Sequence, residues 1–197
     1  MTEHETKTQI LVAAMSVFAQ KGFAKASMND IVRASGLSKG GVYWHFKSKD
    51  DIVAAIFDQF FLAQQTQLET ILTQEGSAAD RLIQMAHLTG EEVETWFAQF
   101  PSPPEFYALA IRDEALTKLL QRYFQFNEDR LVALIEQGIA DGEFRAVNPI
   151  ETAITLTGLF EGILLLWVMY PGHFDLGQQS EKAMQLLLEG LQHSPKD

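Results

Sequence analysis

Hydrophobic residues recur at helical spacing along almost the whole chain. Near the N-terminus, Ile10, Ala13, Ala14, Val17 and Phe18 are separated by steps that place them on one face of a helix over about 6–21. No sustained alternation of apolar and polar residues, the pattern of a half-buried strand, accompanies them. The pattern therefore predicts an all-α protein.

Helix start signals divide this pattern into separate elements. Ser27, Ser48 and Ser77 each precede an Asp by three residues, which is the arrangement of a capping box. Ser102 and Asn148 each precede a proline at the first helical position. One cap stabilises a helix by about 1 kcal/mol, so five together carry more weight than any one. The predicted helices cover about 6–21, 28–35, 38–46, 49–75, 78–97, 103–111, 113–140, 149–170 and 178–192.

The segment 153–170 is nearly as apolar as a membrane span. Its eighteen residues carry one charge, Glu161, and a span needs about 20 apolar residues. Glu161 lies in the middle, Gly158 and Gly162 weaken the hydropathy, and no basic cluster flanks the ends. We therefore favour a helix buried in a core or interface, where the two glycines let another helix come close. Because the acidic N-terminus also has no secretory signal, we expect a cytoplasmic protein with no membrane contact.

Charge is distributed unevenly along the chain. The 197 residues carry a net charge of −11 and no cysteine, which excludes disulfides and thiolate metal sites. Residues 1–49 hold seven Lys/Arg against three Asp/Glu, a net +4, whereas residues 50–197 hold eight against twenty-three, a net −15. A basic head on an acidic body points to a polyanion bound at one end only.

The segment 27–46 predicts a helix-turn-helix. Gly36 permits a sharp turn between two short helices, and Ser38 caps the second. We expect Trp44 and Phe46 to be buried in the small core that this unit shares with the first helix. The second short helix would then enter the DNA major groove.

The residues of this unit with suitable chemistry form the candidate DNA interface. Lysine and arginine bind phosphate, Tyr43 and His45 can hydrogen-bond phosphate or a base edge, and glycines let the backbone approach the duplex. The candidates are Lys25, Ser27, Arg33, Ser38, Lys39, Gly40, Gly41, Tyr43, His45, Lys47 and Lys49.

The run IVRASGLSKGGVYWHFKSKD, residues 31–50, closely resembles the DNA-binding signature of the tetracycline-repressor (TetR) family. Residues 10–14 with Phe18, Gly22 and Phe23 match it as well, and the resemblance extends to about residue 64. It implies a dimeric transcription factor, usually a repressor, whose divergent C-terminal body binds a small molecule and assembles through its last two long helices. We accordingly expect a DNA-binding domain over 1–48 and a ligand-binding and dimerisation domain over 49–197.

Catalytic and metal-binding arrangements are not expected. Gly36 to Gly40 formally match the G-x-S-x-G elbow of hydrolases, but a helix rather than a strand precedes them. His45 has no partner at metal-ligand spacing, and the other histidines are scattered. We therefore expect no enzyme activity, no metal and no cofactor.

An aromatic cluster suggests where a small hydrophobic effector binds. Eight of the 21 aromatic residues fall between Trp96 and Phe126. Aromatic walls with a few polar groups are typical of small-molecule sites. The alternative is plain core packing in a regulator that is constitutive or controlled by a protein partner. The expected wall comprises Met85, His87, Trp96, Phe100, Tyr107, Tyr123, Phe126 and Trp167.

The last two predicted helices supply the expected interface of a homodimer. A two-fold dimer requires a palindromic double-stranded operator with half-sites about 34 Å apart, or a multiple of this distance. The expected interface residues are Gly158, Gly162, Met184, Leu187, Leu188 and Leu191.

Overall fold

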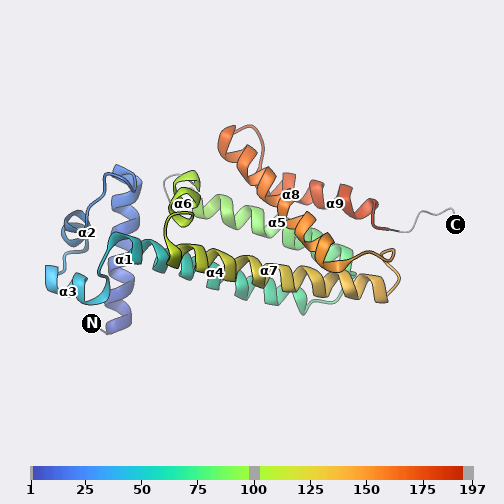
Figure 1. Cartoon of the computed structure of the whole chain (residues 1–197), viewed down its shortest axis with the longest axis horizontal. Coiled ribbons are helices and arrows are strands. Elements are labelled where there is room, and N and C mark those ends of the chain that lie inside the picture. The colour runs from blue at the N-terminus through green and yellow to red at the C-terminus, as the bar shows by residue number, and fades with distance from the viewer. Residues whose placement is uncertain (1, 98–102, 193–197) are drawn as a thin grey trace. The chain divides into compact units, whose positions relative to one another are not determined.

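The computed structural model describes residues 2–97 and 103–192, and these form nine α-helices (Figure 1). An isolated bridge pairs Phe144 with Gln192. The all-α prediction is confirmed, and most helix ends lie within three residues of the expected ones. The helices are α1 (Glu3–Lys21), α2 (Met28–Ser35), α3 (Lys39–His45), α4 (Lys49–Leu72), α5 (Ala78–Phe97), α6 (Pro103–Ala110), α7 (Glu114–Ala140), α8 (Pro149–Met169) and α9 (Leu176–Glu189).

The caps explain where the helices begin. Ser27 and Asp30 form the expected capping box of α2, and the Ser48 and Ser77 hydroxyls accept the backbone N–H of Asp51 and Asp80. Asn148 caps α8 in the same way. Ser102 lies outside the described residues.

Two caps were missed in the sequence. A Thr2–Glu5 capping box starts α1 three residues early, and Asp175 caps α9 ahead of the predicted start.

The chain divides into two compact units. Unit 1 comprises Met1–Leu62 and Thr95–Leu120, and unit 2 comprises Ala63–Glu94 and Gln121–Asp197. The expected boundary at residue 48 coincides with the start of α4, whereas the units divide α4 after Leu62. The long helix α4 therefore carries residues of both units.

Unit 1 contains the three N-terminal helices around a small core. Ile10 and Phe18 of α1, Ile31 of α2 and Val42 of α3 are fully buried. The Gln9 side chain donates to the carbonyl of Ser35 at 2.7 Å and so satisfies the end of α2. These contacts fix the angle between α1 and α2.

Aromatic rings form a second cluster in unit 1. The Trp96 ring lies 4.4 Å from the ring of Phe57 and 4.5 Å from that of Phe60, centroid to centroid. Phe57 also stacks on Phe106. Trp96 is therefore part of a packed apolar core.

Unit 2 is a helical bundle with one very close helix approach. A Cβ at Gly90 of α5 would lie 2.7 Å from the Cα of Gly177 at the start of α9, so both positions require glycine. The Glu143 carboxylate accepts the first N–H groups of α5. The buried core of unit 2 includes Leu68, Leu82, Leu134, Ile135, Leu156 and Leu188.

Helix α8 has one face in this core and another that faces outward. Ala153, Leu156, Ile163 and Leu164 are buried in the bundle. It is the one helix in the described part of the chain that is long and apolar enough, by length and composition, to cross a membrane.

Candidate DNA interface and ligand pocket

The turn between α2 and α3 has the expected geometry. Gly36 ends α2 in the left-handed region, at φ 68° and ψ 7°. Ser38 then caps α3, because its hydroxyl accepts the N–H of Gly41 at 3.0 Å. The predicted helix-turn-helix is thus present within unit 1.

The orientation of α3 differs from the expectation at one residue. Val42 and Phe46 are buried, as predicted for Phe46, but the Trp44 side chain is 64% exposed. Residues four apart share a helix face, whereas Trp44 lies two residues, or about 200°, from each of them. The prediction that Trp44 is buried was therefore wrong, and its indole lies on the outer surface of α3.

The glycines of α3 differ in their surroundings. A Cβ at Gly40 would meet no atom within 4 Å, whereas one at Gly41 would lie 3.3 Å from the Ser38 hydroxyl. A glycine inside a helix costs about 0.5–1 kcal/mol relative to alanine. Packing within the chain therefore does not explain why residue 40 is glycine.

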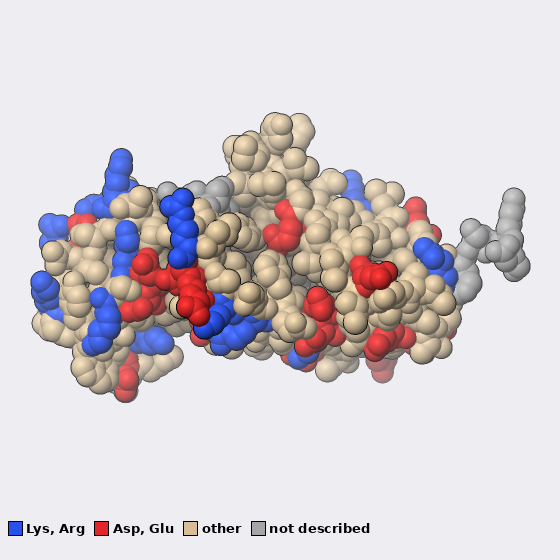
Figure 2. Space-filling model, in the orientation of Figure 1, with Lys and Arg blue, Asp and Glu red and all other residues tan. Residues whose placement is uncertain are grey.

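Basic side chains surround this helix. The Lys39 ammonium lies 5.6 Å from the centroid of the Tyr43 ring, and that of Lys47 donates to the Tyr43 carbonyl at 2.7 Å. Lys25 and Arg33 are exposed. On the face drawn in Figure 2, Lys and Arg side chains gather over the region of α1 to α3.

Lys49 has a structural role within unit 1. Its ammonium donates to the carbonyls of Phe23 and Ala26 at 2.7 and 3.2 Å and lies 4.1 Å from the Phe23 ring centroid. These contacts hold the loop before α2 against the start of α4. Phosphate binding by Lys49 stays a prediction, and it would compete with these bonds.

Asp30 organises the positive charges beside α2. Its carboxylate accepts from Lys21 at 2.6 Å and from the Ser27 hydroxyl, and Arg33 also binds it. The hydrogen bond from Lys21, followed by that from Ser27, holds the pKa of Asp30 well below its usual range. Arg33 therefore offers only part of its hydrogen-bonding capacity to DNA.

Two other candidates also make local contacts. The side chain of Ser27 caps α2, and the His45 ring lies 4.7 Å from that of Trp44 in an edge-on arrangement. DNA contact by any of the candidate residues stays a prediction.

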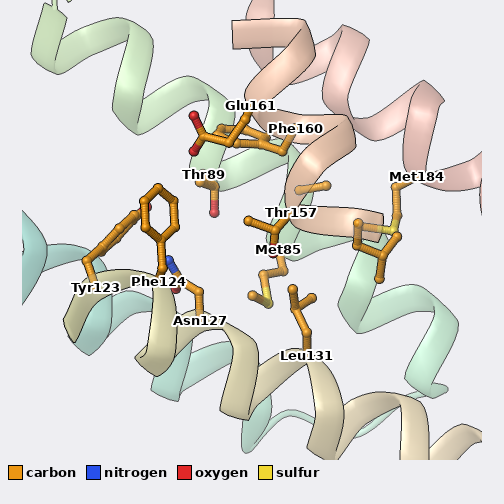
Figure 3. Close-up of a pocket in the computed structure, with 12 residues that line it drawn as sticks. Met85, Thr89, Tyr123, Phe124, Asn127, Leu131, Thr157, Phe160, Glu161 and Met184 are labelled. Atoms are coloured by element: carbon orange, nitrogen blue, oxygen red, sulfur yellow. The ribbon is translucent and has the colours of Figure 1, made fainter. Parts of the chain in front are cut away.

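A pocket lies inside unit 2, between α5, α7, α8 and α9 (Figure 3). It contains about 510 Å³ of space between atoms, part of it open to solvent. Its walls are mostly apolar. The lining residues are Met85, Ala86, Thr89, Tyr123, Phe124, Asn127, Leu131, Leu156, Thr157, Phe160, Glu161 and Met184.

The two ends of the pocket differ in chemistry. Figure 3 shows the Glu161 carboxylate extending from α8 toward the end where Tyr123 and Phe124 lie, with Thr89 nearby. Met85, Leu131 and Met184 lie toward the other end. The pocket is therefore polar and aromatic at one end and aliphatic at the other.

Tyr123 connects the polar end to α4. Its hydroxyl donates to Oε1 of the buried Gln64 at 2.8 Å. Burial raises the pKa of Tyr123, contact with Asn127 lowers it, and the negative charges of Glu161 and Glu92 raise it further. Burial likewise raises the pKa of Glu92, against a lowering by Gln64. Tyr123 is therefore a neutral donor at physiological pH, in surroundings of negative potential.

The expected ligand wall coincides with this pocket at only two of its eight residues. Of the predicted residues, Met85 and Tyr123 line the pocket and Phe100 lies outside the described residues. Trp96 packs in unit 1, and Tyr107 lies beside Phe106 there.

The remaining three residues of the expected wall, all in unit 2, do not line the pocket either. The imidazole of His87 lies against the carboxylates of Glu91 and Glu181. Phe126 packs against the core of unit 2, with the Arg130 guanidinium over its ring. Trp167 follows Glu161 on α8 by six residues.

The lining residues that sequence reasoning missed carried recognisable signals. Asn127 and Leu131 follow the predicted Tyr123 at spacings of four and so share its face of α7. Glu161 is the single charge in the apolar stretch 153–170, which requires a local reason.

Four of the six residues expected at the dimer interface lie in or against the core of the protomer. Met184, Leu188 and Leu191 are buried in the core of unit 2, and Leu187 packs against it. The apolar spacing in α9 therefore serves the protomer's own core. A Cβ at Gly158 or Gly162, by contrast, would meet nothing within 4 Å.

In residues 2–97 and 103–192, no group of three or more His, Asp or Glu side chains is placed to hold a metal ion.

Comparison with known proteins agrees with this architecture. Residues 10–56 match the family model described as bacterial regulatory proteins, tetR family. Residues 80–192 match that of the BetI-type transcriptional repressor, C-terminal. The uncharacterized HTH-type transcriptional regulator YfiR of Bacillus subtilis is 30% identical over 152 residues, which cover 76% of this chain and 74% of YfiR.

Solved structures share the fold at lower identity. The SmeT–triclosan complex, whose repressor comes from Stenotrophomonas maltophilia, superposes with a TM-score of 0.76 at 23% identity, covering 97% of this chain and 93% of SmeT. FadR of Bacillus subtilis in complex with stearoyl-CoA gives a TM-score of 0.72 at 22% identity, covering 93% and 98% of the two chains.

Proposed function

Because the chain belongs to the tetR family of bacterial regulatory proteins, we propose that it is a dimeric repressor that a small effector releases from a palindromic operator. Such a protein acts in the cytoplasm, where its DNA is. Each protomer would place α3 in a major groove.

The outer surface of α3 carries this proposal. Trp44 is exposed although it is a large aromatic residue, and Gly40 is glycine although nothing packs against it. Neither the exposed Trp44 nor Gly40 stabilises the isolated protomer. Both make sense if a duplex covers this surface, because an indole can pack on sugar and base methyl groups and a glycine lets the backbone come close.

The outward face of α8 supports assembly into a dimer. Ile150, Ile154, Leu165, Leu166 and Met169 are all more than half exposed, and Gly158 and Gly162 lie between them along the helix. On α9, Leu186 is exposed as well. An apolar stripe of this length on a protomer is typical of a subunit interface, and a second copy would cover it with two-fold symmetry.

The pocket of unit 2 supports an effector. Its lining from four helices resembles known small-molecule sites in being concave and mostly apolar with a few polar groups. The complexes of SmeT with triclosan and of FadR with stearoyl-CoA are solved examples of ligands in this fold.

A route for the signal follows from the hydrogen bond between Tyr123 and Gln64. Gln64 belongs to α4, which begins directly after the helix-turn-helix. A ligand that displaces Tyr123 would act on α4 and thereby on the spacing of the two α3 helices. Such a ligand induces only as far as it binds the released conformation better than the DNA-bound one.

A regulator without a small ligand remains the second candidate. The packing of Trp96 against Phe57 and Phe60 favours it, because this residue of the expected ligand wall packs in a core instead. A thermal-shift screen separates the two, because a ligand that binds the native state raises the melting temperature.

DNA retention tests the main proposal. The purified protein is mixed with fragmented genomic DNA of its source organism, and retained fragments are sequenced at two salt concentrations. We expect a shared palindromic site whose affinity falls steeply with salt. Retention of random fragments only would refute sequence-specific regulation.

A further inference from the structure

We propose that the pocket of unit 2 selects an amphipathic organic cation: a protonated amine with an aryl or alkyl body and Glu161 as its counter-ion. This inference rests on the proposed effector role of the pocket and specifies the chemical class of its ligand.

The formal charge of the pocket wall is negative. Among the twelve described residues that line it, Glu161 is the one acidic residue, and none is Lys, Arg or His. A carboxylate or phosphate ligand would therefore find no opposite charge and would be repelled by Glu161.

The rings near Glu161 suit a cation as well. Tyr123 and Phe124 of α7 lie at the end of the pocket toward which the Glu161 carboxylate extends, and Phe160 precedes Glu161 on α8 (Figure 3). Aromatic faces attract a cation within about 6 Å of their centroids. The same rings would contact the first carbons of the ligand.

A buried acceptor favours a ligand that carries N–H groups. Oδ1 of Asn127 is buried and has no hydrogen-bond partner in the structure. Buried acceptors are normally paired, because an unpaired one costs the free energy of its lost hydration. The Tyr123 proton already goes to Gln64, so a protonated amine would supply the missing donor.

The opposite end of the pocket determines the chemistry of the ligand's body. Leu131 lies two helical turns from Tyr123 along α7, or about 12 Å at 1.5 Å per residue. Met85 and Met184 provide flexible thioether side chains there, which can adapt to bodies of different shape. An apolar chain or ring therefore suits this end.

The test uses three probes with one body and different head groups. Phenylbutylamine, phenylbutanol and phenylbutyrate are cationic, neutral and anionic at neutral pH, and each is titrated into the full-length protein by calorimetry. We expect the amine to bind at least about tenfold more tightly than the alcohol, because only the amine can form an ion pair with Glu161 in a partly dry pocket. The acid should bind most weakly.

Two variants assign the preference to its residue. Glu161→Gln should reduce amine affinity to that of the alcohol and leave alcohol affinity within about twofold of wild type. Glu136→Gln removes the same charge from an exposed position on α7 and should change nothing. Thermal unfolding confirms that each variant is folded.

Three outcomes would overturn the inference: equal affinities for the three probes, tighter binding of the acid, or no binding of the amine. The wild-type comparison decides this even where Glu161→Gln fails to fold. The proposed function is judged separately by DNA retention. A protein that selects the amine but retains no specific DNA would refute the proposed regulatory function and support the proposed ligand class. A protein that retains specific DNA but does not prefer the amine would refute the ligand class and support the regulatory function.

Discussion

The ammonium of Lys49 donates a 2.7 Å hydrogen bond to the backbone carbonyl of Phe23, which ties the start of α4 to the loop before α2. It also reaches the carbonyl of Ala26. This lysine therefore stabilises the fold of unit 1, whereas Lys47, two residues earlier, is more exposed.

The two lysines should consequently respond differently to substitution. Lys49→Ala should lower the free energy of unfolding by about 2 kcal/mol, because two carbonyls lose a charged donor. Lys47→Ala should leave stability nearly unchanged and lower the slope of log K against log salt by about one, as expected for one lost phosphate contact. Urea unfolding and DNA titrations at several salt concentrations measure both. An unchanged stability in Lys49→Ala would show that its carbonyl contacts contribute nothing.

Trp44 should affect DNA binding rather than folding. Trp44→Ala should change the free energy of unfolding by less than about 0.5 kcal/mol, as is usual for exposed positions, and should weaken operator binding. Phe46→Ala is the matched control two residues away, and its buried ring predicts a loss of about 3–5 kcal/mol. Equal destabilisation by both substitutions would contradict the observed orientation of α3.

Asp30 should make the stability of unit 1 depend on pH. Its pKa is lowered in the folded state from the usual 3.8, chiefly by the hydrogen bond from Lys21. A group with a lowered folded-state pKa stabilises the fold above the unfolded value and loses this effect as pH falls toward the folded value. Asp30→Asn should therefore lower the melting temperature at pH 7, by an amount that shrinks below about pH 4.

A charge-matched control separates this effect from net charge. Glu75→Gln removes one negative charge from an exposed loop of unit 2 and should show no such pH-dependent difference. A gap between wild type and Asp30→Asn that stays constant down to pH 3 would argue against ionic stabilisation by Asp30.

Gly162 should control assembly without affecting the protomer. A Cβ at Gly162 would meet no other part of the described chain within 4 Å, so we expect Gly162→Leu to fold normally and to dissociate a dimer that packs on α8. Sedimentation at micromolar concentration measures the change. Ala140→Leu, at an exposed position on α7, is the control for added apolar surface. A monomeric wild type would refute the proposed interface.

The sequence predicted the helices and the helix-turn-helix because their signals are local. Capping pairs such as Ser27 with Asp30 and the turn at Gly36 depend only on nearby residues. The orientation of side chains within α3 was less accessible. Val42, Trp44 and Phe46 are all large and apolar, and hydrophobicity alone does not say which of them a neighbouring helix covers.

The tertiary sites could not be predicted because they depend on how distant helices meet. Apolar spacing in α9 fits a subunit interface and a protomer core equally well, and the structure assigns Met184 and Leu188 to the core. The pocket joins residues of α5, α7, α8 and α9 that no local pattern connects. Of its lining residues, Met85 and Tyr123 were predicted from the sequence, whereas Glu161 stood out only as an isolated charge.

Footprinting of the protein on a retained genomic fragment tests the central claim most directly. If two protomers present α3 to DNA about a two-fold axis, the protected bases should form two inverted half-sites whose centres are about one helical turn, or a multiple of it, apart. Trp44→Ala should weaken protection of both half-sites together. Protection of a single site without inverted symmetry, or none at any salt concentration, would contradict the account.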